Sequence, residues 1–166
     1  MQEFQPPEAL RHPSPGTSDL ESFRSLQAWD ERVDGFRTPE AEFHQLWEAD
    51  ATGAVVKTRK FPGGRVFPTI MTGGTKYTRI PAPALAVYAV PHMPEDWIRE
   101  STDPAVQKAA RAYFAGIDAL TEKQARAFER LVPGARVVRM PGSHYLFLSN
   151  APEVLRRVQA FIDGLR

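Results

Sequence analysis

Hydrophobic residues form two short runs in the second half of the chain, on either side of a long segment with helical spacing. The first run, Ala84–Val90 (ALAVYAV), is nearly continuous, which is typical of a strand covered on both faces. The second run, Ala135–Met140, is rich in β-branched residues. Between them, Asp103–Leu131 predicts a long helix, with Thr121 and Glu122 as the candidate position of a break. This β-α-β order predicts parallel strands joined by a right-handed crossover.

A second amphipathic helix is predicted at the end of the chain. Asn150 is the expected cap, Pro152 suits the first turn, and Glu153 follows three residues after the cap. One apolar face then repeats at helical spacing through Val154, Leu155, Val158, Phe161, Ile162 and Leu165. Before this helix, a Pro-Gly turn is expected to deliver Ser143, His144 and Tyr145 at the carboxyl end of a strand. Open α/β sheets bind their ligands there.

The first half predicts two short helices with aromatic faces. Ser18 and Glu21 form a capping box for the first helix, which should end at Gly35. Thr38-Pro39-Glu40 should begin the second, which is expected to stop near Asp50–Gly53. A short strand is expected within Ala54–Phe61. The glycine pairs at 63–64 and 73–74 lack the spacing of a phosphate-binding loop, so a flexible loop is expected there.

Composition narrows the classes of function. The 166 residues are 42% apolar and 25% charged, which fits a soluble globular domain. A net charge of +1 argues against nucleic acid or an anionic membrane as partner, and no apolar run approaches a membrane span. The absence of cysteine excludes disulfides and thiolate catalysis. His12, His44 and His92 lack ligand spacing, so neither a metal site nor a cofactor is expected. The compartment stays open, with the cytoplasm as the default.

Residues 79–166 resemble the last part of an α/β-hydrolase. Ile80-Pro81-Ala82-Pro83-Ala84-Leu85 matches the I-P-x-P-x-L pattern that introduces the penultimate core strand of that family. The segment PGSHYLFLSNAPEVLRRVQAFI is similar to its catalytic-histidine loop and terminal helix. Residues 1–78 look like the mostly helical cap of many such enzymes. The resemblance implies an α/β fold, specifically a partial α/β-hydrolase fold with a cap region (1–78) and the last two parallel core strands (79–166).

The resemblance also implies roles for individual residues. His144 would be the general base of a Ser-His-acid triad. The acid would be Asp96 or Glu95. The alternatives are that both are solvated loop charges or a helix cap, and that the acid lies on an earlier strand. Trp29, Trp47 and Tyr145 would contact a small-molecule substrate, although aromatic residues on helical faces more often pack internally.

Two features of the family's site are missing from the sequence. No G-x-S-x-G nucleophile elbow occurs, and no oxyanion segment is present. Ser143 is adjacent to His144, and because neighbouring side chains diverge it is not a credible nucleophile. We therefore expect the C-terminal fragment of a hydrolase of small esters or amides, inactive by itself and needing a complementing N-terminal half. The alternative is a non-catalytic module that binds a small molecule or a protein, with a homodimer as one form.

Overall fold

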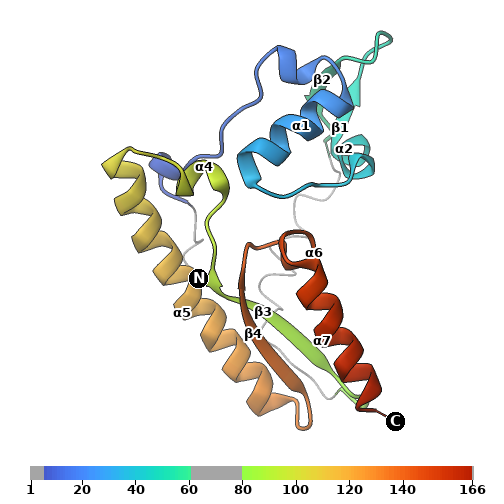
Figure 1. Ribbon diagram of the computed structural model, residues 1–166, viewed down its shortest axis with the longest axis vertical. Helices are drawn as coiled ribbons and strands as arrows, with labels where there is room; N and C mark the ends of the chain where they lie inside the picture. Colours follow the sequence, from blue (N-terminus) through green and yellow to red (C-terminus); the bar gives the residue numbers. More distant parts are fainter. Residues whose placement is uncertain (1–5, 61–79, 166) are drawn as a thin grey trace. The chain divides into compact units, whose positions relative to one another are not determined.

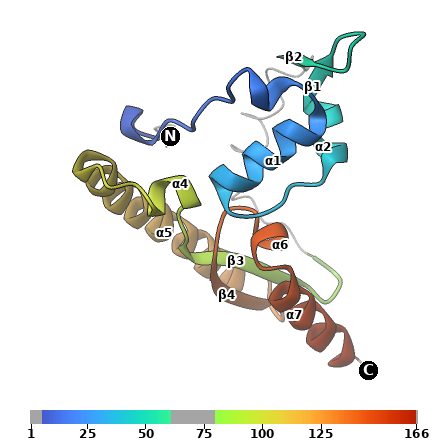
Figure 2. The same cartoon turned by 45° about the horizontal axis from the view of Figure 1, so that its top comes forward.

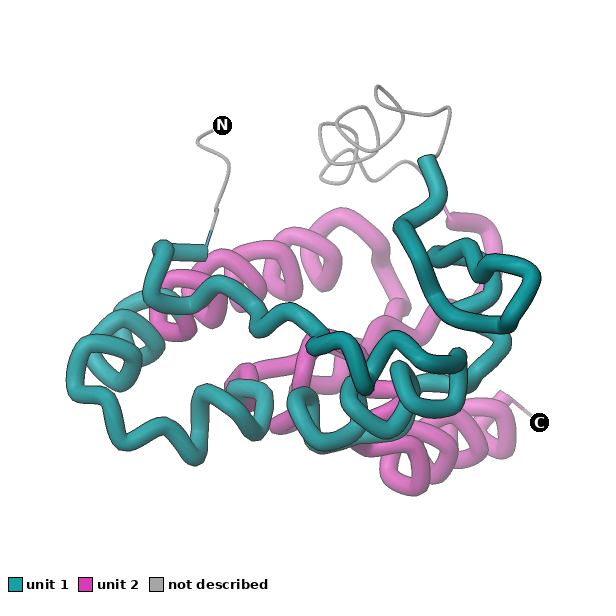
Figure 3. Tube along the Cα trace, turned by 90° about the horizontal axis from the view of Figure 1, so that it is seen from above, with its two compact units in different colours: residues 1–61, 94–113 teal, residues 62–93, 114–166 magenta. Residues whose placement is uncertain are grey.

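The structure, a computed structural model, describes residues 6–60 and 80–165 and divides into two compact units. Within the described residues, unit 1 contains residues 6–60 and 94–113, and unit 2 contains residues 80–93 and 114–165 (Figure 3). The predicted boundary at residues 78–79 and the glycine-rich loop both fall in the segment outside the described residues. Helices and small sheets are mixed throughout the described residues, so the fold class is α/β.

The first long helix of unit 1, α1 (Phe23–Asp34), follows two single-turn 3-10 helices, η1 (Glu8–Leu10) and η2 (Ser18–Leu20) (Figure 1). Its cap is Ser22, whose hydroxyl accepts a hydrogen bond from the Ser25 N–H at 3.0 Å. The prediction that Ser18 caps this helix is wrong, because Ser18 begins η2 instead. The predicted stop at Gly35 is confirmed, and its φ of 80° is the left-handed conformation that glycine adopts readily.

A small antiparallel sheet follows the second helix, α2 (Glu40–Leu46). Strand β1 (Trp47–Ala49) pairs with β2 (Val55–Thr58), which confirms the expected short strand. The prediction that α2 continues to residues 50–53 is wrong, because Trp47 is extended and pairs with Thr58. The turn between the strands is held by the Asp50 carboxylate, which accepts a hydrogen bond from the Thr52 N–H at 2.8 Å.

Unit 1 has a core of three buried side chains, Leu26, Phe43 and Val55, which come from α1, α2 and β2. Four partly buried residues pack against this cluster: Leu20, Phe23, Trp29 and Trp47. Unit 1 also contains the single-turn helix α4 (Asp96–Arg99). The polar sequence of residues 91–102 predicts only a loop here. Its short helix buries Ile98, whose apolar side chain is one of a few in a mostly polar segment.

Unit 2 contains the predicted parallel pair of strands, β3 (Leu85–His92) and β4 (Arg136–Gly142). Their register sets Tyr88 opposite Arg139 and His92 opposite Gly142. Both strands run further than predicted, and Pro141-Gly142 belongs to β4 rather than to a turn. The reason is that the pairing continues to the strand ends, where the Met93 N–H donates to the Gly142 carbonyl at 2.9 Å.

One continuous helix, α5 (Pro104–Leu131), joins the two strands, as the β-α-β pattern predicted. Its start is fixed by the Asp103 carboxylate, which accepts a hydrogen bond from the Ala105 N–H at 2.7 Å. The suspected break at Thr121 and Glu122 does not occur. Both views in Figures 1 and 2 draw the β3–β4 pair between the later part of α5 and the terminal helix α7 (Ala151–Asp163).

The end of the chain forms two helices rather than one. A single-turn helix, α6 (Leu146–Ser149), precedes α7. Asn150 lies between them but its side chain does not cap α7. Its amide group instead donates to the Pro141 carbonyl at 3.0 Å, which ties the start of α7 to the end of β4. No described helix is both long and apolar enough to cross a membrane.

Candidate functional site

His144 lies in the short loop that follows the carboxyl end of β4. It is exposed, and its ring meets the neighbouring Tyr145 ring edge-on, with 5.1 Å between centroids. The loop is held by Ser143, which is buried and accepts a hydrogen bond from the Tyr145 N–H at 3.2 Å. Leu146, also buried, then begins α6. The local fold therefore presents the imidazole outward from a firmly held turn at a strand end.

Tyr145 shares this surface. Its ring is edge-on to Phe147 at 6.1 Å, and its residue remains 48% exposed. Phe147 is exposed as well. Aromatic side chains beside an imidazole suit an apolar substrate, and the substrate-binding role of Tyr145 stays a prediction.

A second imidazole stands at the end of the neighbouring strand. His92 is the last residue of β3, and its side chain is only 8% exposed. Its Nδ1 lies 2.9 Å from Oδ1 of Asp118, a residue of α5. The same carboxylate oxygen accepts a hydrogen bond from the backbone N–H of His92 at 2.8 Å. The carboxylate of Asp118 therefore holds His92 at the carboxyl end of β3.

The pair of His92 and Asp118 was not predicted from the sequence. His92 was considered as a metal ligand without suitable spacing and as a position where the resemblance would place an acid, and Asp118 was not considered. Two signals were present: His92 closes the apolar run of the first strand, and Asp118 lies on the helix that crosses back over that strand. The 26 residues between them hide the contact from any search for local motifs.

The two acids proposed from sequence lie on the other unit. Asp96 opens α4 and forms an ion pair with Arg99 at 2.7 Å. Glu95 precedes that helix, and its backbone carbonyl accepts hydrogen bonds from the N–H groups of Ile98 and Arg99. Burial, followed by the charge of Glu95, raises the pKa of Tyr113. These contacts fit the alternative of a helix start with local charge pairs, and a triad role for Asp96 or Glu95 stays a prediction.

Trp29 and Trp47 also belong to unit 1. Both pack against the buried cluster of Leu26, Phe43 and Val55. This is the internal role that aromatic residues on helical faces most often have, and a substrate-binding role for either one stays a prediction.

A polar cluster surrounds His12 in unit 1. Nε2 of His12 lies 2.9 Å from Asp34, and its ring is edge-on to Trp29 and Trp97. The hydrogen bond with Asp34 raises the pKa of His12, and burial raises the pKa of Asp30. Two buried atoms in the described residues lack a hydrogen-bond partner, Asp30 Oδ2 and Trp97 Nε1. Within the same residues no group of three or more metal-ligand side chains occurs.

Comparisons with known proteins add no relative. No family model, no curated protein and no solved structure matches this chain. Unit 2 itself places two imidazoles, His92 and His144, at the neighbouring ends of β3 and β4.

Proposed function

We propose that unit 2 provides the histidine-bearing part of a hydrolase site of the α/β-hydrolase kind, with His144 as general base. The observation that carries the proposal is the parallel β3–β4 pair, joined by α5 and followed by a loop that exposes His144. The carboxyl edge of a parallel sheet is where open α/β folds bind ligands. The substrate class is a small, partly apolar ester or amide, which Tyr145 and Phe147 would contact.

In this proposal His144 takes the proton of an attacking hydroxyl and returns it to the leaving group. The hydroxyl has to come from outside the described site. Ser143 is buried, and its Oγ already accepts a hydrogen bond from the loop. We therefore propose that a complementing segment supplies the nucleophile and the oxyanion donors, and that the chain alone forms no acyl-enzyme.

The second candidate is a binding module without catalysis, which could form a homodimer. It is favoured by the exposed apolar side chains of α7, Leu155 and Ile162, and by Leu165 just beyond it. It is also favoured by the β3–β4 sheet, in which each strand has a single neighbour among the described residues. An open strand edge commonly pairs with another chain.

The test supplies the missing nucleophile as an added alcohol. The purified chain is incubated with p-nitrophenyl acetate and methanol, and methyl acetate is quantified by NMR. A positioned general base contributes about 10²–10⁴-fold in a complete site, so we expect about a tenfold loss in His144→Ala, where no oxyanion donors assist. His44→Ala is the matched control, because His44 is an exposed histidine of unit 1 whose contacts are an ion pair with Glu40 and a ring contact with Phe23.

Size-exclusion chromatography of the same samples separates the two candidates. A methyl acetate rate that His144→Ala leaves unchanged contradicts the proposed base. If that chain also elutes as a well-folded dimer, the binding module is the better account.

A further inference from the structure

The contact between His92 and Asp118 has the geometry of a base and the carboxylate that orients it. Asp118 Oδ1 accepts from the backbone N–H of His92 at 2.8 Å and from Nδ1 of the same residue at 2.9 Å. A carboxylate that binds Nδ1 selects the tautomer with the proton on that nitrogen. The lone pair of Nε2 is then available to accept a proton, as in a Ser-His-Asp site.

Burial keeps this imidazole in one orientation. The His92 side chain is 8% exposed, whereas Asp118 is 27% exposed. Two hydrogen bonds to one oxygen also hold the strand end against α5. Such a bond is electrostatically stronger in a partly buried site than in water, so the selected tautomer is favoured more than it would be on an open surface.

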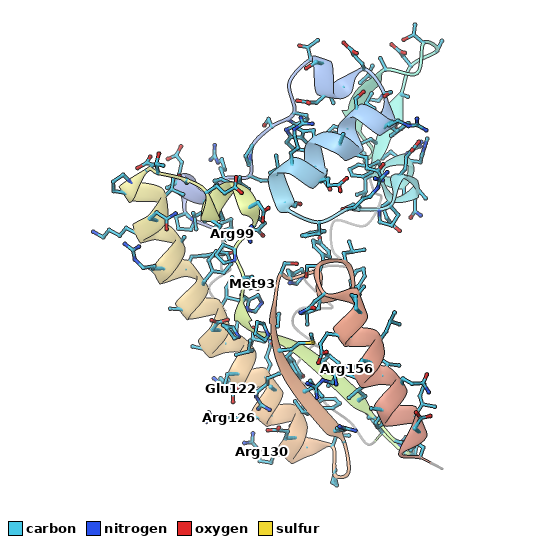
Figure 4. The ribbon with its side chains drawn as sticks, viewed as in Figure 1. Met93, Arg99, Glu122, Arg126, Arg130 and Arg156 are labelled. Carbon is cyan, nitrogen blue, oxygen red and sulfur yellow. The ribbon has the colours of Figure 1, made fainter. Side chains whose placement is uncertain are left out.

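The position of His92 links it to the site already described. His92 is paired in register with Gly142, two residues before His144. The next residue, Met93, donates its N–H to the Gly142 carbonyl at 2.9 Å. The ends of β3 and β4 are thus hydrogen-bonded to each other. His92 is the last residue of β3, and His144 follows the end of β4 at the same edge of the sheet. Met93, labelled in Figure 4, marks this edge.

We propose that His92, oriented by Asp118, is a second general base at the carboxyl edge of the β3–β4 pair. The proposal rests on the hydrolytic function for its chemistry, but not on His144 being a base. As an alcohol or water attacks the ester carbonyl, its proton passes to Nε2 of His92 while the new C–O bond forms. When the old C–O bond breaks, the proton passes to the leaving oxygen, or to buffer if the leaving group departs as an anion.

The competing explanation is that Asp118 only fastens α5 to the end of β3. The variant His92→Asn separates the two roles. Its side-chain amide can still donate to Asp118 from near the position of Nδ1, so the fastening is retained. It has no basic nitrogen, so proton transfer is lost. The matched control is His12→Asn, because His12 is a second histidine bonded to an aspartate, Asp34, in unit 1.

The first measurement is the tautomer of His92 in the full chain, from long-range ¹H–¹⁵N NMR. We expect the Nδ1–H tautomer in the wild type, and a shift toward Nε2–H in Asp118→Asn. An Nε2–H tautomer in the wild type overturns the proposal, because Asp118 then does not orient the ring as a base.

The second measurement is the methanol-dependent formation of methyl acetate, with circular dichroism as the check of folding. We expect about a tenfold loss in His92→Asn and none in His12→Asn. An unchanged rate in a folded His92→Asn chain overturns the proposal and leaves only the fastening role. If His92→Asn fails to fold, Asp118→Asn takes its place, and the same loss or its absence decides.

The two proposals fail separately. A loss in His92→Asn with no loss in His144→Ala keeps the inference about His92 and removes His144 as the base. A loss only in His144→Ala does the reverse.

Discussion

The two units differ in which hydrophobic residues they bury. In unit 1, Leu26 is 1% exposed and forms a buried cluster with Phe43 and Val55, against which four partly buried side chains pack. In unit 2, the buried cluster is smaller: Ala89, Met140 and Leu146, with Val87 and Val154 beside them. No residue of α7 is buried, and Leu155 on that helix is 67% exposed.

This contrast shows that amphipathic spacing and burial are separate properties. The apolar face of α7 is as regular in sequence as that of α1, yet only α1 is well covered by its own unit. A two-stranded sheet offers little area on either face, and isolated pairs of strands are marginally stable. Periodicity therefore identifies which face of a helix is apolar, whereas its coverage depends on how many elements are available to cover it.

The largest effect we expect is in the core of unit 1. Leu26→Ala should lower the free energy of unfolding by about 2–5 kcal/mol, the usual cost of removing a buried leucine side chain. Urea unfolding followed by tryptophan fluorescence measures it, because Trp29, Trp47 and Trp97 all lie in unit 1. Leu155→Ala in unit 2 is the control, with an expected change within about 0.5 kcal/mol. Its unfolding is followed by far-UV circular dichroism, because the three tryptophans report on unit 1 alone. Equal losses in the two variants would abolish the contrast.

A smaller effect is expected at the end of α1. Gly35 has a φ of 80°, and a Cβ there would collide with the Asp96 side chain. Gly35→Ala should cost about 1–3 kcal/mol from backbone strain, with the displacement of Asp96 in addition. Gly53→Ala is the matched control, because Gly53 has a φ of 91° and no atom within 4 Å of the added Cβ. Comparison of the two by thermal unfolding isolates the collision, and equal melting temperatures would show that Asp96 moves without cost.

The smallest effect is expected from the ion pairs of unit 2. Arg139 on β4 bonds Glu122 at 2.6 Å and Glu129 at 2.8 Å, both on α5. Hydrogen bonds from Arg139, then from Arg126, lower the pKa of Glu122 to about 2 from 4.5. Figure 4 labels Glu122 and Arg126 on neighbouring turns of α5. A lowered pKa means stabilisation that is complete above pH 4.5 and is lost as the pH falls toward 2.

In unit 1, the partly buried carboxylate of Asp30 gives stability the opposite dependence on pH. Because burial raises the pKa of Asp30, its protonation favours the folded state, and that contribution is lost as the pH rises through the raised value. Acid should therefore weaken the ion pairs of unit 2, whereas in unit 1 it should remove the cost of burying the charged Asp30 carboxylate.

Arg139→Gln should reduce the acid-dependent loss of helical circular dichroism between pH 4.5 and 2. Arg130→Gln, which alters an arginine of α5 outside the described ion pairs, should leave that loss unchanged.

The order of the elements in unit 2 could be predicted from sequence because each has a strong local signal. The run Ala84–Val90 and the β-branched run Ala135–Met140 both became strands, and their parallel pairing followed from the intervening helix. The helix α5 (Pro104–Leu131) nearly coincides with the predicted range Asp103–Leu131. These signals act over a few residues, which is why they can be recognised without the fold.

The errors occurred where distant residues decided the local structure. Trp47 was expected to be helical, but it pairs with Thr58, eleven residues later. Asn150 is a residue type that commonly caps helices, but its side-chain amide donates to the Pro141 carbonyl near the end of β4. The error at the start of α1 is local instead: Ser18 and Ser22 precede the same apolar stripe, and the capping-box pattern pointed to the earlier serine, whereas Ser22 is the cap.

The candidate site was predicted only in its local part. His144 lies at a strand end as expected, because strand and turn signals surround it. The partner of His92 could not be identified, since Asp118 reaches it only through the crossover of α5. Asp96 and Glu95 are predicted as acids from their distance along the chain to a strand end, and that role stays a prediction.

The path of the chain between the units has a consequence for synthesis on the ribosome. Unit 1 is completed by residues 94–113, which are translated after β3 of unit 2 and before β4. At about 5–20 residues per second, the apolar strand β3 waits a few seconds for Arg136–Gly142 to be made. Throughout that interval a nascent chain would expose an unpaired hydrophobic strand, so the protein should depend more on early chaperone contact than a chain whose paired strands are consecutive.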